Sequence, residues 1–169
     1  MSEKASPSPH IGRFLAGIAA LIYDPQTQRY LLLRRASDRD FGADRWECVT
    51  GRVDQGESFA QSLHREVGEE IGGRVQIDFI VGTSHFYRGP ATPEYELLSV
   101  LYGCTILNPD EIRFGAEHSE MRWVSADEAL VLFPQGYWLR EVIQRAETLR
   151  AHLPAVLIDM FHQNEFEII

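Results

Sequence analysis

The chain has 169 residues and a net charge of −9 at pH 7, from 25 acidic and 16 basic side chains. This length suits one domain with a sizeable core and excludes a second catalytic domain. The acidic balance argues against binding to a nucleic-acid polymer, because such binding rests on neutralising phosphates with basic side chains.

The N-terminal segment contains no export or membrane signal. Residues 1–10 are polar, contain two prolines and are expected to form a disordered lead-in. The longest apolar run, residues 14–23, is far too short to span a membrane. Cys48 and Cys104 are too few for a disulfide framework. We therefore expect a cytoplasmic protein with reduced cysteines and no membrane contact.

The first half of the chain predicts three strands. Residues 14–23 form a continuous apolar run of strand length, and residues 30–35 form a second one. The turn-like sequence Asp-Pro-Gln-Thr between them predicts a hairpin. Residues 36–45 are polar and rich in turn formers, and residues 46–53 predict a short third strand.

A helix is predicted from Ser58 to Ile71. Ser58 and Gln61, three residues apart, form a capping-box signature, and a Gly-Gly pair follows Ile71. Apolar residues at three- and four-residue steps form one stripe: Ala60, Leu63, Val67 and Ile71. Three carboxylates lie about a quarter-turn around from it: Glu66, Glu69 and Glu70. These carboxylates should therefore sit at the rim of the core.

The second half predicts further strands and two helices. Residues 74–88 and 94–107 suit two antiparallel strands, and residues 121–124 another. A second capping box at Ser125 predicts a short helix to Leu132.

A longer helix is expected over residues 136–152, with Trp138, Val142, Ala146 and Leu149 on one face. Residues 154–169 are compatible with a helix, a strand or a subunit contact. Strands interleaved with three helices predict an α/β/α sandwich with a mixed β-sheet, spanning residues 11–153.

The carboxylates of the first helix need a cation. Each pair of charges about 5 Å apart costs on the order of 3 kcal/mol at an effective dielectric near 20. A divalent ion fits this need, because Mg²⁺ shares its shell between one or two carboxylates and substrate phosphates. A solvated acidic helix face is the alternative for the Glu-Glu pair alone. The joint spacing favours the metal site: Gly51, Glu57, Arg65, Glu66, Glu69, Glu70 and Gly72.

Residues 51–73 resemble the Nudix box at every charged position. Nudix hydrolases cleave a nucleoside diphosphate linked to another moiety and use Mg²⁺ or Mn²⁺ held on the box helix. The sequence Trp-Glu-Cys-Val-Thr-Gly at residues 46–51 resembles the bacterial dihydroneopterin triphosphate and dATP pyrophosphohydrolases. The Glu-His loop at residues 114–118 is similar to that subgroup as well. The resemblance implies a Nudix fold and cleavage of a phosphoric anhydride.

The resemblance also implies roles for individual residues. The metal would be bound by Glu66 and Glu70, with Glu117 completing the site from its loop and the backbone carbonyl of Gly51 approaching the metal. Glu69 would bind a further ion or orient water. Arg65 and Glu57 would form an ion pair that fixes the loop against the helix. Substrate contacts are expected from Thr50 and from Arg34 or Arg35. His118 could orient Glu117 through a hydrogen bond or merely pack.

The function implied is cleavage of a nucleoside triphosphate or pterin triphosphate to a monophosphate and pyrophosphate. Metal-activated water would attack phosphorus, with Glu69 or Glu117 accepting the proton. Alternatives are a Nudix hydrolase of dinucleoside polyphosphates, nucleoside diphosphate sugars or oxidised nucleotides, and a non-catalytic Nudix-like nucleotide-binding module. The intact Arg-Glu-x-x-Glu-Glu core at residues 65–70 argues against the last. The sequence is also compatible with a homodimer.

Overall fold

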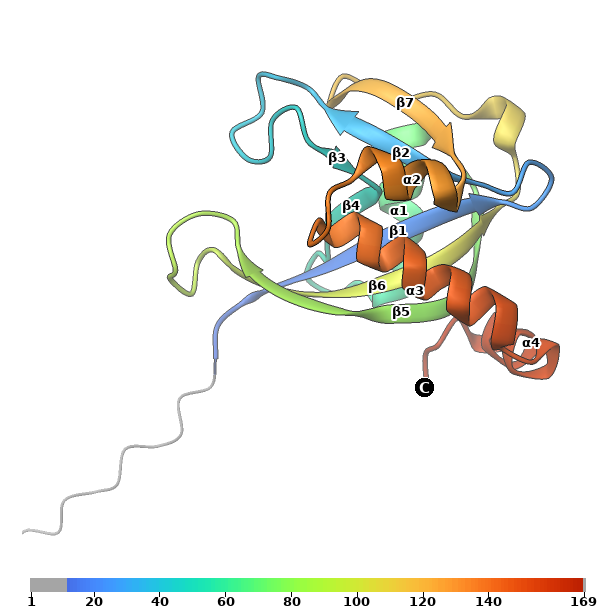
Figure 1. Ribbon diagram of the computed structural model, residues 1–169. Helices are drawn as coiled ribbons and strands as arrows, with labels where there is room; N and C mark the ends of the chain where they lie inside the picture. The colour runs from blue at the N-terminus through green and yellow to red at the C-terminus, as the bar shows by residue number, and fades with distance from the viewer. Residues whose placement is uncertain (1–11, 169) are drawn as a thin grey trace, which may run out of the picture.

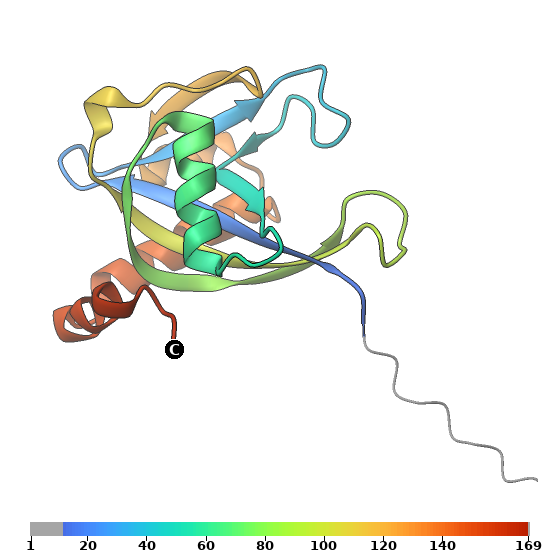
Figure 2. The same ribbon diagram turned by 180° about the vertical axis from the view of Figure 1, so that it is seen from behind.

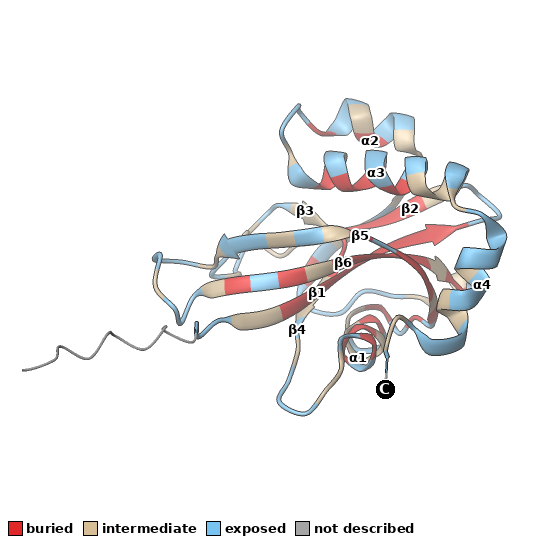
Figure 3. Ribbon diagram, turned by 90° about the horizontal axis from the view of Figure 1, so that it is seen from below, coloured by how far each residue is buried: buried red, intermediate tan, exposed pale blue. Residues whose placement is uncertain are grey.

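A seven-stranded mixed sheet forms the centre of the molecule, with helices on both of its faces (Figures 1 and 3). The computed structural model describes residues 12–168, so the lead-in predicted for residues 1–10 lies outside the described residues. The strand order is β3-β2-β1-β6-β5, with β4 also paired to β1 and β7 to β2. The predicted α/β/α sandwich is confirmed.

Strand β1 (Leu15–Asp24) organises the sheet by changing partner along its length. It pairs in parallel with β6 (Glu96–Ile106) over nine residues, and β6 pairs antiparallel with β5 (Val75–Tyr87). On its other edge β1 pairs with β2 (Arg29–Arg35) only beside the predicted hairpin turn. Residues 17–20 of β1 pair with β4 (Val49–Arg52) instead.

The strand predicted at residues 46–53 is two strands, because Cys48 separates β3 (Trp46–Glu47) from β4. Strand β3 pairs with β2, whereas β4 pairs with β1. Strand β7 (His118–Val124) begins three residues before the predicted start and pairs with β2. The chain thus brings both β3 and the start of β7 to the same end of β2.

Helix α1 (Phe59–Ile71) covers one face of the sheet (Figure 2). The predicted capping box is present: the Gln61 amide donates to Ser58 Oγ at 3.2 Å, and the Ser58 amide donates to Gln61 Oε1 at 2.9 Å. Gly72 ends the helix in the left-handed region, at φ 63°. The predicted apolar stripe is buried throughout: Ala60, Leu63, Val67 and Ile71.

The sequence of strand β1 is an unbroken apolar run because helices cover both faces of the sheet, so its side chains are buried on either side. Alternate side chains pack under α1: Ile18, Ala20 and Ile22. The others pack toward the opposite core: Ala19, Leu21 and Tyr23.

Helices α2 (Ala126–Leu132) and α3 (Trp138–His152) cover the opposite face (Figure 3). The expected inner face of α3 is partly wrong. Val142 and Ala146 are buried, but Trp138 is 41% exposed. Leu139 and Ile143 are buried as well, so the buried face is wider than the predicted stripe and includes the next residue along the helix. Trp138 faces the cavity described below.

The C-terminal tail forms helix α4 (Ala155–Asn164), which decides between helix and strand for this segment, while the subunit contact stays a prediction. His162 on α4 lies 3.2 Å from the buried Asp78 on β5. A short 3₁₀ helix, η1 (Pro109–Glu111), follows β6. Among residues 12–168, no helix has the length and apolar character needed to cross a bilayer.

Replacing Gly68 by Ala should stabilise the protein by about 1 kcal/mol, because glycine in a helix interior costs about that much relative to alanine. A Cβ at this position would meet no atom within 4 Å apart from its own helix backbone. Urea unfolding followed by circular dichroism should show a higher midpoint with an unchanged slope. A lower midpoint would contradict the open surroundings of Gly68.

Candidate active site

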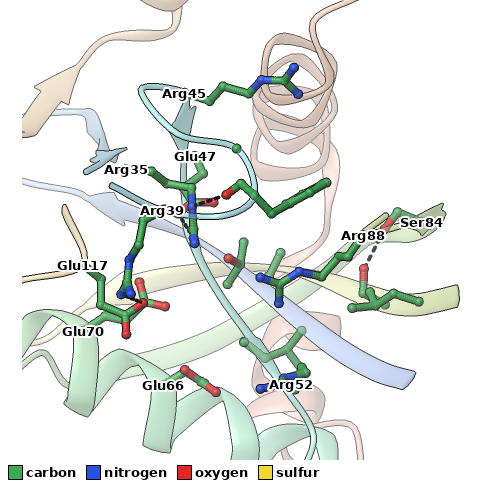
Figure 4. Close-up of a pocket in the computed structure, with 18 of the residues that line it drawn as sticks. Arg35, Arg39, Arg45, Glu47, Arg52, Glu66, Glu70, Ser84, Arg88 and Glu117 are labelled. Atoms are coloured by element: carbon green, nitrogen blue, oxygen red, sulfur yellow. Dashed lines mark hydrogen bonds and ion pairs between the residues drawn. The ribbon is translucent and has the colours of Figure 1, made fainter. Parts of the chain in front are cut away.

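A cavity of about 940 Å³ lies where α1, residues 36–45 and the β5–β6 hairpin meet (Figure 4). One group of lining side chains is acidic: Glu47, Glu66, Glu69, Glu70 and Glu117. A second group is basic: Arg35, Arg39, Arg45, Arg52 and Arg88. Charges of both signs thus share one concave site, as a site for an anionic substrate with a metal cation requires.

The predicted ion pair between Arg65 and Glu57 is present and bidentate. Arg65 Nε lies 2.7 Å from Glu57 Oε1, and Arg65 Nη2 lies 2.9 Å from Glu57 Oε2. These hydrogen bonds lower the pKa of Glu57. Arg65 also donates to the backbone carbonyl of Arg52 at 2.9 Å and to Glu66 Oε1 at 2.9 Å. Arg65 therefore ties the loop, the strand end and the helix together.

Glu70 is the carboxylate most strongly perturbed by the fold. Its side chain is 11% exposed, and its Oε2 atom is buried with no hydrogen-bond partner. Burial, and then the nearby charges of Glu47, Glu66 and Glu117, raise its pKa to about 9, against the effect of a Thr50 backbone hydrogen bond. A cation beside Glu70 would relieve this cost.

The three carboxylates of α1 differ in depth more than the helical periodicity suggested. Glu66 is 15% exposed, close to Glu70, whereas Glu69 is 62% exposed. Glu69 also accepts a hydrogen bond from Arg65 at 3.3 Å. Glu66 and Glu70 thus lie at the rim of the core as expected, and Glu69 lies further out, because the neighbouring β4 covers only part of the helix face.

Glu47 and His118 form a buried pair that the sequence reasoning missed. His118 Nε2 lies 3.2 Å from Glu47 Oε1 and 3.7 Å from Glu70 Oε2. His118 therefore contacts Glu47 rather than Glu117, and neither open reading of its role included this contact. The signal available was Glu47 itself, a lone charge within the apolar strand run of residues 46–49.

Glu117 lies at the cavity on the loop before β7, and its side chain is 58% exposed. Its Oε2 atom lies 2.5 Å from Arg39 Nη2. Arg39 belongs to the polar segment of residues 36–45 and was not predicted as a site residue. No local pattern marks it, because its role depends on how this segment folds back over the sheet.

The structure separates the two candidate arginines. Arg35 lines the cavity, where Arg35 Nη1 lies 2.8 Å from Glu47 Oε1. Arg34 does not line it and faces Asp44 and Glu120 at 3.5 and 3.8 Å. Successive strand residues point to opposite faces, which accounts for the difference. Thr50 lines the cavity as expected for a substrate contact.

Gly51 lies directly against Glu66. A Cβ added to Gly51 would come within 2.0 Å of Glu66 Cδ, so no other residue fits without moving that carboxylate. The Gly51 carbonyl oxygen lies beside Gly17 of β1. A glycine is thus required here by packing as well as by the predicted approach of its carbonyl to a metal, which stays a prediction.

These side chains fit a divalent metal for which the protein supplies some of the ligands and the substrate phosphates supply the others. Within residues 12–168, no three His, Cys, Asp or Glu side chains gather into a ready metal cage. Mg²⁺ needs only one or two carboxylates when substrate phosphates complete its shell. The buried Oε2 of Glu70 accepts no hydrogen bond, and the Glu66 side chain lies against Gly51 beside it, so these two carboxylates meet that requirement.

Comparisons with known proteins agree with this geometry. The NUDIX domain family matches residues 13–146. The dihydroneopterin triphosphate diphosphatase of Escherichia coli (strain K12) is 31% identical over 129 residues, which cover 68% of this chain and 81% of that protein. The MutT protein of Methanosarcina mazei Go1 has the same fold, with a TM-score of 0.67 at 23% identity, over 84% of this chain and 99% of that one.

A further relative is a longer protein. An octanoyltransferase of Myxococcus xanthus is 36% identical over 119 residues. The match covers 70% of this chain but only 32% of that protein, so the chain spans about a third of its length. The similarity therefore concerns one part of the relative and does not transfer its activity.

Proposed function

The chain belongs to the Nudix hydrolase family, and we propose that it is an Mg²⁺-dependent pyrophosphohydrolase of a nucleoside triphosphate or a pterin triphosphate. The observation that carries the proposal is the buried carboxylate of Glu70, whose Oε2 atom accepts no hydrogen bond, in a cavity that five arginines also line. Such a site suits a polyphosphate, whose negative charge must be neutralised while water attacks it. The proposed location is the cytoplasm.

Mg²⁺ would be held mainly by the carboxylates of Glu66 and Glu70. Further ligands would be Glu69, Glu117 and the backbone carbonyl of Gly51. When bound there, Mg²⁺ would neutralise phosphate charge and lower the pKa of the attacking water. Mn²⁺ has the same ligand preference and is an alternative ion.

The chain's own side chains supply the remaining chemistry. Water attacks a phosphorus atom, the bridging oxygen leaves with the pyrophosphate, and a carboxylate accepts the proton of the water. Glu69 and Glu117 are the two candidates for that base, since both line the cavity and are more than half exposed. Arg65 positions Glu66 through its 2.9 Å contact, and Arg35 and Thr50 contact the substrate.

Two observations support a triphosphate as the substrate. The relative from E. coli acts on dihydroneopterin triphosphate, as its name states, and the alignment covers 81% of it. The segment from Trp46 to Gly51 matches the same subgroup and lines the cavity through Trp46, Glu47, Thr50 and Gly51. The rival substrates lack this support.

A substrate panel tests the proposal. The protein is incubated with Mg²⁺ and dihydroneopterin triphosphate, dATP, other nucleoside triphosphates, ADP-ribose or diadenosine tetraphosphate, and release of pyrophosphate and phosphate is measured. We expect pyrophosphate and a monophosphate from at least one triphosphate, at a rate above those of the last two compounds. Absence of turnover for the whole panel, with Glu70→Gln indistinguishable from the wild type, would leave the enzyme proposal without support.

A further inference from the structure

Arg88 follows the last residue of β5 and extends into the cavity from the β5–β6 hairpin (Figure 4). Glu66 and Glu70 lie on α1, across the cavity from it (Figure 4). Two neighbouring cavity arginines, Arg35 and Arg39, pair with Glu47 and Glu117. Within residues 12–168, neither Arg88 nor the other two cavity arginines, Arg45 and Arg52, forms an ion pair. Arg45 and Arg52 are exposed to solvent, whereas Arg88 is half-buried.

The surroundings of Arg88 are unfavourable to a cation. Burial, followed by the charges of Arg35 and Arg52, lowers its pKa, and the more weakly acting Glu47 and Glu117 do not offset this. A half-buried guanidinium among like charges lacks the compensation that protein cations ordinarily have. A negatively charged ligand would supply it.

Aromatic side chains hold Arg88 in this place. Its Cζ atom lies 5.5 Å from the ring centroid of Phe41, and Phe41 stacks on Phe86 with centroids 6.4 Å apart and an interplanar angle of 17°. The two rings join residues 36–45 to the β5–β6 hairpin. Stacking uses a flat face of the guanidinium and leaves its N–H groups, which lie in the plane, available for hydrogen bonds.

The cavity therefore has two differently charged parts. The carboxylates of Glu66 and Glu70 suit a cation, and through it the phosphates at the reacting bond. Arg88 suits an anionic group beyond those phosphates, because guanidinium groups bind phosphate in a bidentate manner.

We propose that Arg88 binds a further phosphate of the substrate, beyond those at the reacting bond, and so makes the site select a triphosphate over a diphosphate. This inference rests on the proposed function for its substrate class. A diphosphate would fill the reacting position and leave the Arg88 guanidinium without a partner. The preference should therefore depend on the N–H groups of Arg88.

A calorimetric experiment with saturating Mg²⁺ tests the anion site, because the ion would hold the first phosphates at Glu66 and Glu70 and leave the next one to Arg88. Inorganic tripolyphosphate and pyrophosphate are titrated into the wild type, Arg88→Gln and Arg88→Lys, with Arg74→Gln as matched control. Arg74 is an exposed arginine that does not line the cavity. We expect Arg88→Gln to weaken tripolyphosphate binding about tenfold or more, because it removes hydrogen bonds to a charged group. Pyrophosphate binding should change little, Arg88→Lys should retain part of the affinity, and Arg74→Gln should match the wild type.

Kinetics and a packing variant complete the test. With the triphosphate identified by the panel, Arg88→Gln should raise KM by a similar factor, whereas Phe41→Leu should lower thermal stability with a smaller effect on KM. Equal tripolyphosphate affinities for Arg88→Gln and the wild type would overturn the inference, as would identical effects of Arg88→Gln and Phe41→Leu. If the enzyme turns over a triphosphate and Arg88→Gln has the same KM as the wild type, the inference about Arg88 is refuted and the proposed function is not. Arg88-dependent binding without turnover of any substrate refutes the proposed function alone.

Discussion

Replacing Glu70 by Gln is expected to lower turnover by about 10³-fold, the equivalent of about 4 kcal/mol of transition-state stabilisation. The carboxylate of Glu70 is the most buried of the acidic groups that line the cavity, and its Oε2 atom accepts no hydrogen bond. An amide of the same shape keeps the packing but cannot offer a negative charge to a divalent ion. Steady-state rates with the best triphosphate of the panel measure the effect.

The same variant should be more stable than the wild type in metal-free buffer. Burial and neighbouring carboxylates place the pKa of Glu70 at about 9 in the folded protein, against 4.5 for an unperturbed glutamate. Between these pH values the folded state holds a proton that the unfolded state has lost. The stabilising effect is therefore complete below pH 4.5 and falls as pH rises to 9, by as much as about 1.4 kcal/mol per pH unit.

Thermal unfolding in EDTA from pH 5 to 9 tests whether the stability of the wild type falls as pH rises. The wild type should lose stability with rising pH more steeply than Glu70→Gln, and added Mg²⁺ should stabilise the wild type more than the variant. The exposed Glu141 on α3 supplies the matched control, since Glu141→Gln should change neither rate nor pH slope. Equal pH slopes for Glu70→Gln and the wild type would refute the burial argument.

Replacing Gly51 by Ala should reduce turnover by about 10²-fold, the loss that a displacement of about 1 Å produces in a catalytic group. The added Cβ would lie 2.0 to 2.2 Å from three atoms of the Glu66 side chain, Cδ, Cγ and Oε1. Because that side chain is flexible and β4 is not, we expect the carboxylate to move and the fold to persist. Rates and unfolding curves, measured together, separate the two effects.

Gly68→Ala is the control for that substitution, since it makes the same chemical change within the same box. Nothing lies within 4 Å of a Cβ at Gly68, so this variant should gain stability and keep its turnover. If Gly51→Ala retains full activity, the close contact between Gly51 and Glu66 has no part in catalysis. If it fails to fold, the clash falls on the strand instead of the carboxylate.

Features that depend on neighbours in the chain were predictable from the sequence. The capping box at Ser58 and Gln61 and the stripe from Ala60 to Ile71 are present as predicted. The pair of Arg65 with Glu57 is also present, because both lie in one loop-helix unit of short sequence separation. The inner face of α3 was misjudged at Trp138, since helical periodicity alone does not say which of two adjacent stripes meets the sheet.

By itself, the sequence determined the mixed three-layer fold and the helix that presents the carboxylates, because these follow from local spacing and apolar periodicity, and it indicated the Nudix family through the resemblance of residues 51–73 to the Nudix box. Only the tertiary structure decided the depth of Glu70, the choice of Arg35 over Arg34, and the approach of Arg88 to the cavity. Those properties arise where β3, residues 36–45 and the β5–β6 hairpin meet α1, across long separations in the chain. Burial and electrostatic interactions depend on distance in space, and the sequence specifies that distance only through the complete fold.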